Sequence, residues 1–162
     1  MVWTSCGRSG NDGYADTSWW LAYKCRRDTH HSAAISLFDR EPHAQILWTP
    51  WQRVEVFNTF RQTERAGLID SGESRQLIRL LEQEVRLGYW SHAEFDWIDA
   101  VRTACEISAE HSLTMLIRGM DLFHVAVAVE VAADAFLSFD DEQNTIAENA
   151  GLPLIRLPAR AR

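Results

Sequence analysis

Residues 121–140, DLFHVAVAVEVAADAFLSFD, carry the pattern from which the fold can be inferred. The stretch opens on an acid, Asp121, and continues through an apolar segment of helical character. After a turn it enters a short apolar segment, residues 135–139, that is typical of a strand, and it ends on a second acid, Asp140. Buried carboxylates need a compensating positive charge, and a divalent cation supplies it where several carboxylates converge. A cation site at this unit therefore requires further acids at equivalent places in the chain.

The composition indicates one ordinary globular domain. The chain has 162 residues, of which 46% are hydrophobic and 24% charged, which excludes a disordered or fibrous protein. No apolar run approaches the roughly 20 residues that a membrane helix needs. The residues MVWTSCGRSGNDG are polar and rich in glycine, so we do not expect them to act as a signal peptide. The three scattered cysteines (Cys6, Cys25 and Cys105) indicate a reducing compartment, so we expect a cytoplasmic protein without disulfides.

The net charge of −7 argues against a protein that binds nucleic acid through a generally basic surface. It does not argue against a nuclease, because carboxylates that hold a metal enter the count without their cation.

Short apolar strands alternate with helical segments along the chain, which predicts an α/β fold with a parallel sheet and helices on both faces. We expect a flexible extension at residues 1–13, a single domain at 14–157 and a basic tail at 158–162. The predicted strands are residues 14–15, 44–48, 135–139 and 154–157. The predicted helices are residues 19–27, 32–39, 51–66, 74–88, 96–111, the segment that opens at Asp121, and 141–150.

Two helix starts have recognisable caps. Thr49 and Gln52 predict a capping box around Pro50, and Val54 is expected on the apolar face of the helix that follows. Ser71 is expected to cap the next helix.

Four acids fall at equivalent places in this arrangement. Asp16 ends the first predicted strand and Asp140 ends the strand at residues 135–139. Glu55 lies in the second turn of the helix after the strand at 44–48, and Asp121 lies in the first turn of its helix. Since ligands gather at the carboxyl ends of parallel strands, all four acids should lie near one sheet edge. Such a set would hold Mg²⁺ or Mn²⁺ through oxygen ligands.

At this point the chain resembles the PIN domains, and most closely the VapC-type toxins of bacterial toxin–antitoxin pairs. The matching pieces are YADTS with Asp16, VEVFNTF with Glu55, RGMDLFHVAVAVEVAADAFLSFD with Asp121 and Asp140, and IAENAGLPLI near the end. The resemblance covers nearly all of residues 14–157. It implies a PIN-like three-layer α/β/α sandwich with a short central parallel sheet. It also implies Mg²⁺- or Mn²⁺-dependent endonucleolytic cleavage of RNA, a small antitoxin partner and a homodimer.

The chain departs from the family pattern at its N-terminal extension, at Trp19-Trp20 and at Asp141, which stands as a second acid beside Asp140. Trp19, Trp20, Trp48 and Trp51 flank the predicted site and are suited to stacking on bases, or to building the core and dimer or partner interfaces, and we prefer the second interpretation. We interpret Asp141 as an acid that favours a helix start, while its position leaves a role as a fifth ligand open.

The resemblance gives each acid a role. Asp16, Asp121 and Asp140 would be metal ligands, and Glu55 would bind metal or hold the attacking water. The metal would lower the pKa of a bound water, whose attack would leave a 3′-hydroxyl and a 5′-phosphate. Any one of these acids alone would equally suit a helix cap or a solvated surface.

Polar residues beside the acids are candidates for supporting them. Thr17 and Ser18 would either hydrogen-bond the acidic cluster or a phosphate, or cap the helix that follows. Ser138 would support Asp140.

Two further residues flank Asp121. His124 lies one helical turn after it on the same face, where it is suited to donate to a carboxylate or a substrate. We prefer to interpret this histidine as a structural hydrogen-bond partner, because hard oxygen sites rarely recruit imidazole. Arg118 precedes the helix and would reach a phosphate or pair with an acid.

The same residues bear on three other functions: a phosphatase, a nuclease without a toxin role and a non-catalytic binding module. A phosphatase of the haloacid dehalogenase type also has an acid after its first strand, but it needs a second Asp two residues on, where this chain has Ser18, and Lys24 is poorly placed for its lysine. A PIN-fold nuclease of RNA processing without a toxin role and a non-catalytic PIN-fold binding module remain open.

Overall fold

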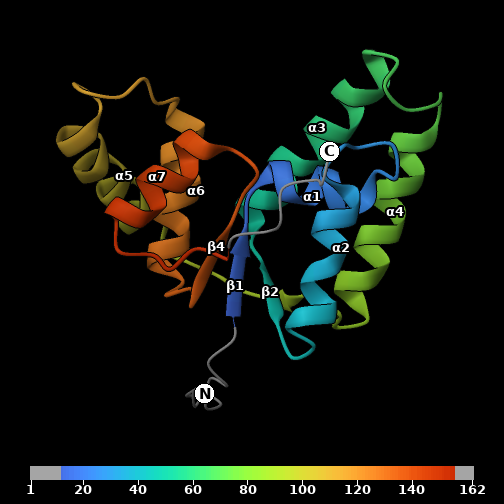
Figure 1. Cartoon of the computed structure of the whole chain (residues 1–162), viewed down its shortest axis with the longest axis horizontal. Coiled ribbons are helices and arrows are strands. Elements are labelled where there is room, and N and C mark those ends of the chain that lie inside the picture. Colours follow the sequence, from blue (N-terminus) through green and yellow to red (C-terminus); the bar gives the residue numbers. More distant parts are fainter. Residues whose placement is uncertain (1–11, 156–162) are drawn as a thin grey trace.

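A short parallel sheet forms the centre of the computed structural model, which describes residues 12–155 (Figure 1). Its strands are β1 (Asp12–Ala15), β2 (Gln45–Trp48), β3 (Ser91–His92) and β4 (Ala135–Leu137). They lie in the order β3-β2-β1-β4, and every pairing is parallel. Tyr14 is in register with Leu47 on one side and with Phe136 on the other.

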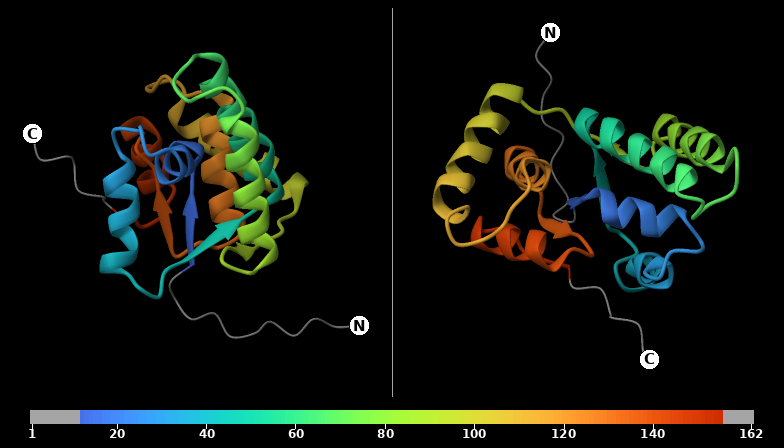
Figure 2. Two further views of the ribbon diagram at one scale, coloured as in Figure 1. Left: turned by 90° about the vertical axis from the view of Figure 1, so that its right-hand side faces the viewer. Right: turned by 90° about the horizontal axis from the view of Figure 1, so that it is seen from above.

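Helices cover both faces of this sheet. They are α1 (Thr17–Lys24), α2 (His31–Arg40), α3 (Pro50–Arg65), α4 (Glu73–Arg86), α5 (Trp97–His111), α6 (Gly119–Glu130) and α7 (Asp141–Asn149). Helices α1 to α4 lie on one side of the strands and α5 to α7 on the other, as Figures 1 and 2 show. The three-layer α/β/α fold expected from the sequence is therefore confirmed.

Alternate residues of each strand point to opposite layers, which explains why the successive buried residues of β1, β2 and β4 are apolar. One core, under α1 to α4, contains the strand residues Ala15, Ile46, Trp48 and Leu137. The other core, under α5 to α7, contains the strand residues Tyr14, Leu47 and Phe136.

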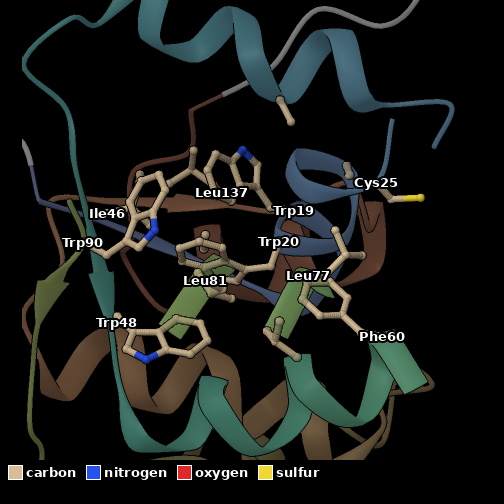
Figure 3. Packing of buried hydrophobic residues seen from close by; sticks show 14 of the residues in the cluster. Trp19, Trp20, Cys25, Ile46, Trp48, Phe60, Leu77, Leu81, Trp90 and Leu137 are labelled. Atoms are coloured by element: carbon tan, nitrogen blue, oxygen red, sulfur yellow. The ribbon is translucent and has the colours of Figure 1, made fainter. Parts of the chain in front are cut away.

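Aromatic rings fill the first core. The ring of Trp20 lies 5.2 Å from Trp19, 5.0 Å from Trp48 and 5.1 Å from Trp90, measured between centroids and in edge-on geometry (Figure 3). Edge-on pairs suit the ring quadrupoles and add to the stabilisation from burial. The interpretation of Trp19, Trp20 and Trp48 as core residues is confirmed, and Trp51 is partly buried in the other core.

The ends of the domain differ from the sequence expectation. Strand β1 begins at Asp12, so residues 12 and 13 of the expected extension belong to the sheet, while residues 1–11 lie outside the described part. A Cβ on Gly13 would approach Leu137 Cδ1 to 2.8 Å, so a side chain there would force its neighbour to move. Of the expected last strand at 154–157, Leu154 forms a parallel bridge with Phe136, while residues 156 and 157 and the tail at 158–162 lie outside the described residues.

Two local predictions on α3 and α4 were wrong, although the capping box of Thr49 and Gln52 is present. Val54 is 65% exposed, because Val56 and Phe60, four residues apart, set the buried face of α3 and Val54 lies off it. Ser71 does not cap α4.

The α4 cap comes from another helix. Helix α4 begins after Gly72, whose φ of 84° suits glycine, and the carboxylate of Glu64 on α3 accepts hydrogen bonds from the backbone N–H groups of Gly72 and Ser74, each 2.9 Å long. Strand β3 was not predicted, since its two residues are too few to show a pattern.

The order in which strands are added to the sheet reverses at β1. It steps from β1 to β2 and β3 on one side and then crosses back to β4 on the other side. Ligands of open parallel sheets bind outside the carboxyl ends of the strands at such a reversal. Within residues 12–155 no helix combines the length and apolar composition needed to cross a membrane.

Candidate active site

Asp16 lies at the carboxyl end of β1 with only 4% of its surface exposed. It caps α1, because its Oδ1 accepts the backbone N–H of Trp19 at 2.9 Å. The Ser18 hydroxyl donates to both carboxylate oxygens at 2.8 and 2.9 Å, and the Ser138 hydroxyl donates to Oδ2 at 2.7 Å. Burial raises the pKa of Asp16, and the nearby charge of His124 and these hydrogen bonds act in the opposite direction.

Ser138 joins Asp16 to the segment that follows β4. Its Oγ accepts the backbone N–H of Asp140 at 2.9 Å while its hydroxyl donates to Asp16. The side chain therefore supports the carboxylate of Asp16 and the backbone of Asp140, whereas we had expected it to support Asp140 alone. The Asp140 carboxylate caps α7, accepting the backbone N–H groups of Glu142 at 2.9 Å and Gln143 at 3.1 Å.

Glu55 reaches the site from α3, with 26% of its side chain exposed. Its Oε2 accepts the Thr17 hydroxyl at 2.8 Å and also bonds to Nε2 of His124. Burial would raise the pKa of Glu55, but the hydrogen bond and charge of His124 together with the Thr17 hydroxyl outweigh burial and lower it. Thr17 thus donates a hydrogen bond to Glu55, and Ser18 donates to Asp16.

His124 is almost fully buried beside Glu55, with 2% of its surface exposed. Its Nδ1 lies 2.9 Å from the hydroxyl of Tyr14, and its ring centroid lies 5.9 Å from that of Trp51. The imidazole therefore connects α6 to both β1 and α3.

Asp121 differs from the other acids. Its carboxylate is partly exposed and accepts no hydrogen bond from any residue within 12–155. Burial raises the pKa of Asp121, the charge of Asp140 raises it further, and Arg118 and His124 act in the opposite direction. Arg118 is exposed and forms no ion pair with another described residue.

Two polar residues of the site were missed from the sequence. Tyr14 is fully buried, and burial raises the pKa of its phenol well above the usual range. Gln143 is buried, and its amide donates to the backbone oxygen of Asp121 at 3.3 Å. The signals were present: a buried tyrosine hydroxyl needs a partner, and Gln143 stands three residues after the cap Asp140, as in a capping box.

Comparison with known families gives a clear match: the sequence pattern of the PIN domain covers residues 14–149. The chain belongs to the PIN-domain family. Comparison with curated protein sequences gives no significant match.

Solved structures show the same PIN fold at low sequence identity. The Mycobacterium tuberculosis toxin VapC20, which is described as cleaving the sarcin–ricin loop, is 17% identical with a TM-score of 0.63, over 89% of this chain and 98% of that one. A chain of Rickettsia felis VapBC2, solved on a DNA fragment from its promoter, is 12% identical with a TM-score of 0.62, over 91% and 99%. A chain of FitAcB from Neisseria gonorrhoeae is 11% identical with a TM-score of 0.59, over 89% and 96%.

The acids of this PIN domain meet at one edge without closing around a common point. Among the residues from 12 to 155, no three His, Cys, Asp or Glu side chains are placed to hold a metal ion. Asp16, Glu55 and Asp140 each direct oxygens to donors of the protein. The residue set nevertheless suits a hard divalent cation, because it consists of carboxylates and the Asp121 carboxylate receives no hydrogen bond from the described residues.

Proposed function

We propose that this PIN-domain protein is a Mg²⁺- or Mn²⁺-dependent endoribonuclease and the toxin of a toxin–antitoxin pair. One observation carries the proposal: the Asp121 carboxylate is partly enclosed near Asp140 and Glu55 and accepts no hydrogen bond from a described residue, and burial together with the charges of these two acids raises its pKa. Carboxylates that oppose one another's ionisation in a partly enclosed place are favourable ligands for a cation. Membership of the PIN family supports a hydrolase acting on nucleic acid.

In this proposal Asp16, Glu55, Asp121 and Asp140 hold the cation. A bound Mg²⁺ or Mn²⁺ would supply positive charge to the scissile phosphate and lower the pKa of water. The residues around the acids would keep them in place. Ser18 and Ser138 hold Asp16, whereas Thr17 and His124 hold Glu55.

Arg118 is suited to the phosphate backbone of the substrate. It lies at the N-terminus of α6, is exposed, and acts electrostatically on Asp121 without forming an ion pair in the described part of the chain. A guanidinium in this position can donate two parallel hydrogen bonds to a phosphate.

The choice of RNA and of a toxin role rests on similarity of fold. VapC20 is described as a toxin that cleaves the sarcin–ricin loop, and VapBC2 was solved on a fragment of its own promoter. These likenesses support an RNA substrate and a small antitoxin partner, and the family resemblance adds a homodimer. We also propose a cytoplasmic location, where such a substrate is found.

The activity can be tested with purified protein and RNA in the presence of Mg²⁺ or Mn²⁺. Cleavage should stop in EDTA and in Asp16→Asn and Asp140→Asn. The matched control is Asp141→Asn, because Asp141 is the neighbouring acid and is exposed in the first turn of α7. Cleavage that persists in EDTA or in Asp16→Asn would contradict the mechanism.

The toxin role can be tested in cells. Expression of the wild-type chain should arrest growth, and Asp121→Asn should relieve the arrest. Arrest that persists with Asp121→Asn would separate toxicity from the acidic site.

A further inference from the structure

We propose that His124, anchored by Tyr14, is a positioning residue that fixes Glu55 so that one carboxylate oxygen stays available to a cation. The inference rests on the proposed function, since it concerns the same metal site. It assigns to an imidazole and a phenol a task in building the site, without making either of them a ligand.

The donors along this chain of contacts can be assigned. An ionised carboxylate only accepts hydrogen bonds, so Nε2 of His124 carries the hydrogen that is donated to Glu55 Oε2. In the neutral imidazole Nδ1 is then the acceptor, and the Tyr14 hydroxyl donates to it across 2.9 Å; in the protonated imidazole Nδ1 donates to the phenol oxygen instead. In both forms Tyr14 bonds to Nδ1, and Nε2 is the nitrogen that donates to Glu55.

The two oxygens of Glu55 are used unequally. Oε2 receives the hydroxyl of Thr17 at 2.8 Å and Nε2 of His124. Oε1 receives no hydrogen bond from any residue that the structure describes, and the side chain is 26% exposed. A carboxylate held by one oxygen presents the other in a defined direction, which reduces the entropy lost when it binds a ligand.

The contact also joins the two helical layers. Glu55 lies on α3, which packs with α1 and α4, whereas His124 lies on α6, in the opposite layer. Because His124 follows Asp121 by one turn of α6, its bond to Glu55 holds that acid close to the helix that carries Asp121. The ring itself is enclosed between Tyr14 and Trp51, with centroid distances of 5.8 and 5.9 Å.

The decisive measurement is Mn²⁺ affinity by titration calorimetry, with thermal unfolding as a check of the fold. The double variant Tyr14→Phe/His124→Leu removes both partners of the buried bond together, so no buried hydroxyl is left without a partner. It should bind Mn²⁺ about 10 to 100 times more weakly than the wild type, as is typical when a group that orients a ligand is lost. Tyr14→Phe alone should weaken binding less, because the imidazole stays in place.

A matched pair tests the same point with both variants polar. The amide of His124→Gln reaches about as far as Nε2 and can still donate to Glu55, whereas the amide of His124→Asn is one methylene too short. His124→Gln should keep affinity close to that of the wild type, and His124→Asn should lose about as much as the double variant.

The outcomes separate the two proposals. Wild-type affinity in a folded double variant, or equal affinities of His124→Gln and His124→Asn, would overturn the positioning role while the proposed function stands. If the double variant does not fold, the Gln and Asn pair decides. Absence of Mn²⁺ binding by the wild type would overturn the metal site and the inference together.

Discussion

Asp16 and Asp121 stand at the same edge of the sheet, yet the protein treats them differently. Asp16 is almost fully buried and receives hydrogen bonds from two serine hydroxyls and a backbone N–H. Asp121 is partly exposed and receives none from the described residues. Burial raises the pKa of both acids, and the charge of His124 opposes that rise at both. The hydrogen bonds of Trp19, Ser138 and Ser18 oppose it further at Asp16, whereas the charge of Asp140 adds to it at Asp121.

The difference distinguishes an acid that supports the fold, Asp16, from an acid whose carboxylate the described residues leave open, Asp121. Asp16 is part of the fold, since it caps α1 and joins β1 to the segment after β4. The Asp121 carboxylate is partly exposed and receives no hydrogen bond from residues 12–155, so it is open to solvent and, in the proposed function, to a cation.

The largest expected effect contrasts the stability of two variants without metal. Asp16→Ala should lose about 2 kcal/mol, because α1 loses its cap and Ser18 and Ser138 lose an acceptor. Asp121→Ala should stay within about 0.5 kcal/mol of the wild type, because no hydrogen bond is broken. Urea unfolding in EDTA at neutral pH measures both.

The control for this contrast is Asp16→Asn, which keeps an oxygen that can accept the N–H of Trp19 and should lose less than Asp16→Ala. Equal losses for the two alanine variants would show that the fold does not distinguish Asp16 from Asp121.

An intermediate effect is expected from the support of Asp16. Ser138→Ala removes the donor to Asp16 Oδ2 and the acceptor for the N–H of Asp140, and should lower stability by about 1 kcal/mol in the same urea assay. Thr145→Ala is a suitable control, because Thr145 is exposed and its hydroxyl bonds only within α7. A loss no greater than that of the control would mean that Asp16 is held without Ser138.

The smallest effect is a difference in pH dependence. Because the pKa of Asp121 is raised from 3.8, the folded wild type binds this proton more tightly than the unfolded chain does. The carboxyl therefore favours folding while it is protonated, and this contribution is lost as pH rises from 3.8 through the raised value. Asp121→Asn should thus gain stability relative to the wild type over that range, measured by unfolding in EDTA.

Glu55→Gln should show the opposite sign. The pKa of Glu55 is lowered from 4.5, so its contribution is present above 4.5 and is lost as pH falls through the lowered value. The wild type should therefore gain stability relative to Glu55→Gln as the pH rises to 4.5. If the stability of both variants relative to the wild type changed with pH in the same direction, the pKa values of Asp121 and Glu55 could not be shifted in opposite directions.

Much of the fold could be predicted because the signals are local. The alternation of apolar strands and helices predicts the layers, and the capping box of Thr49 and Gln52 involves residues only three positions apart. The failures concern partners distant in sequence. The start of α4 is capped by the Glu64 carboxylate on α3, and not by Ser71 as expected. Val54 is exposed because another side of α3 packs against the core.

The sequence by itself determined the parallel α/β fold and the placing of Asp16, Glu55, Asp121 and Asp140 at one sheet edge, because strand ends and first helical turns follow from local pattern. Only the tertiary structure decided how each acid is held. Ser138 meets Asp16 across 122 positions, and His124 meets Glu55 across 69. Such contacts depend on how the two helical layers pack against the sheet, which no local pattern encodes.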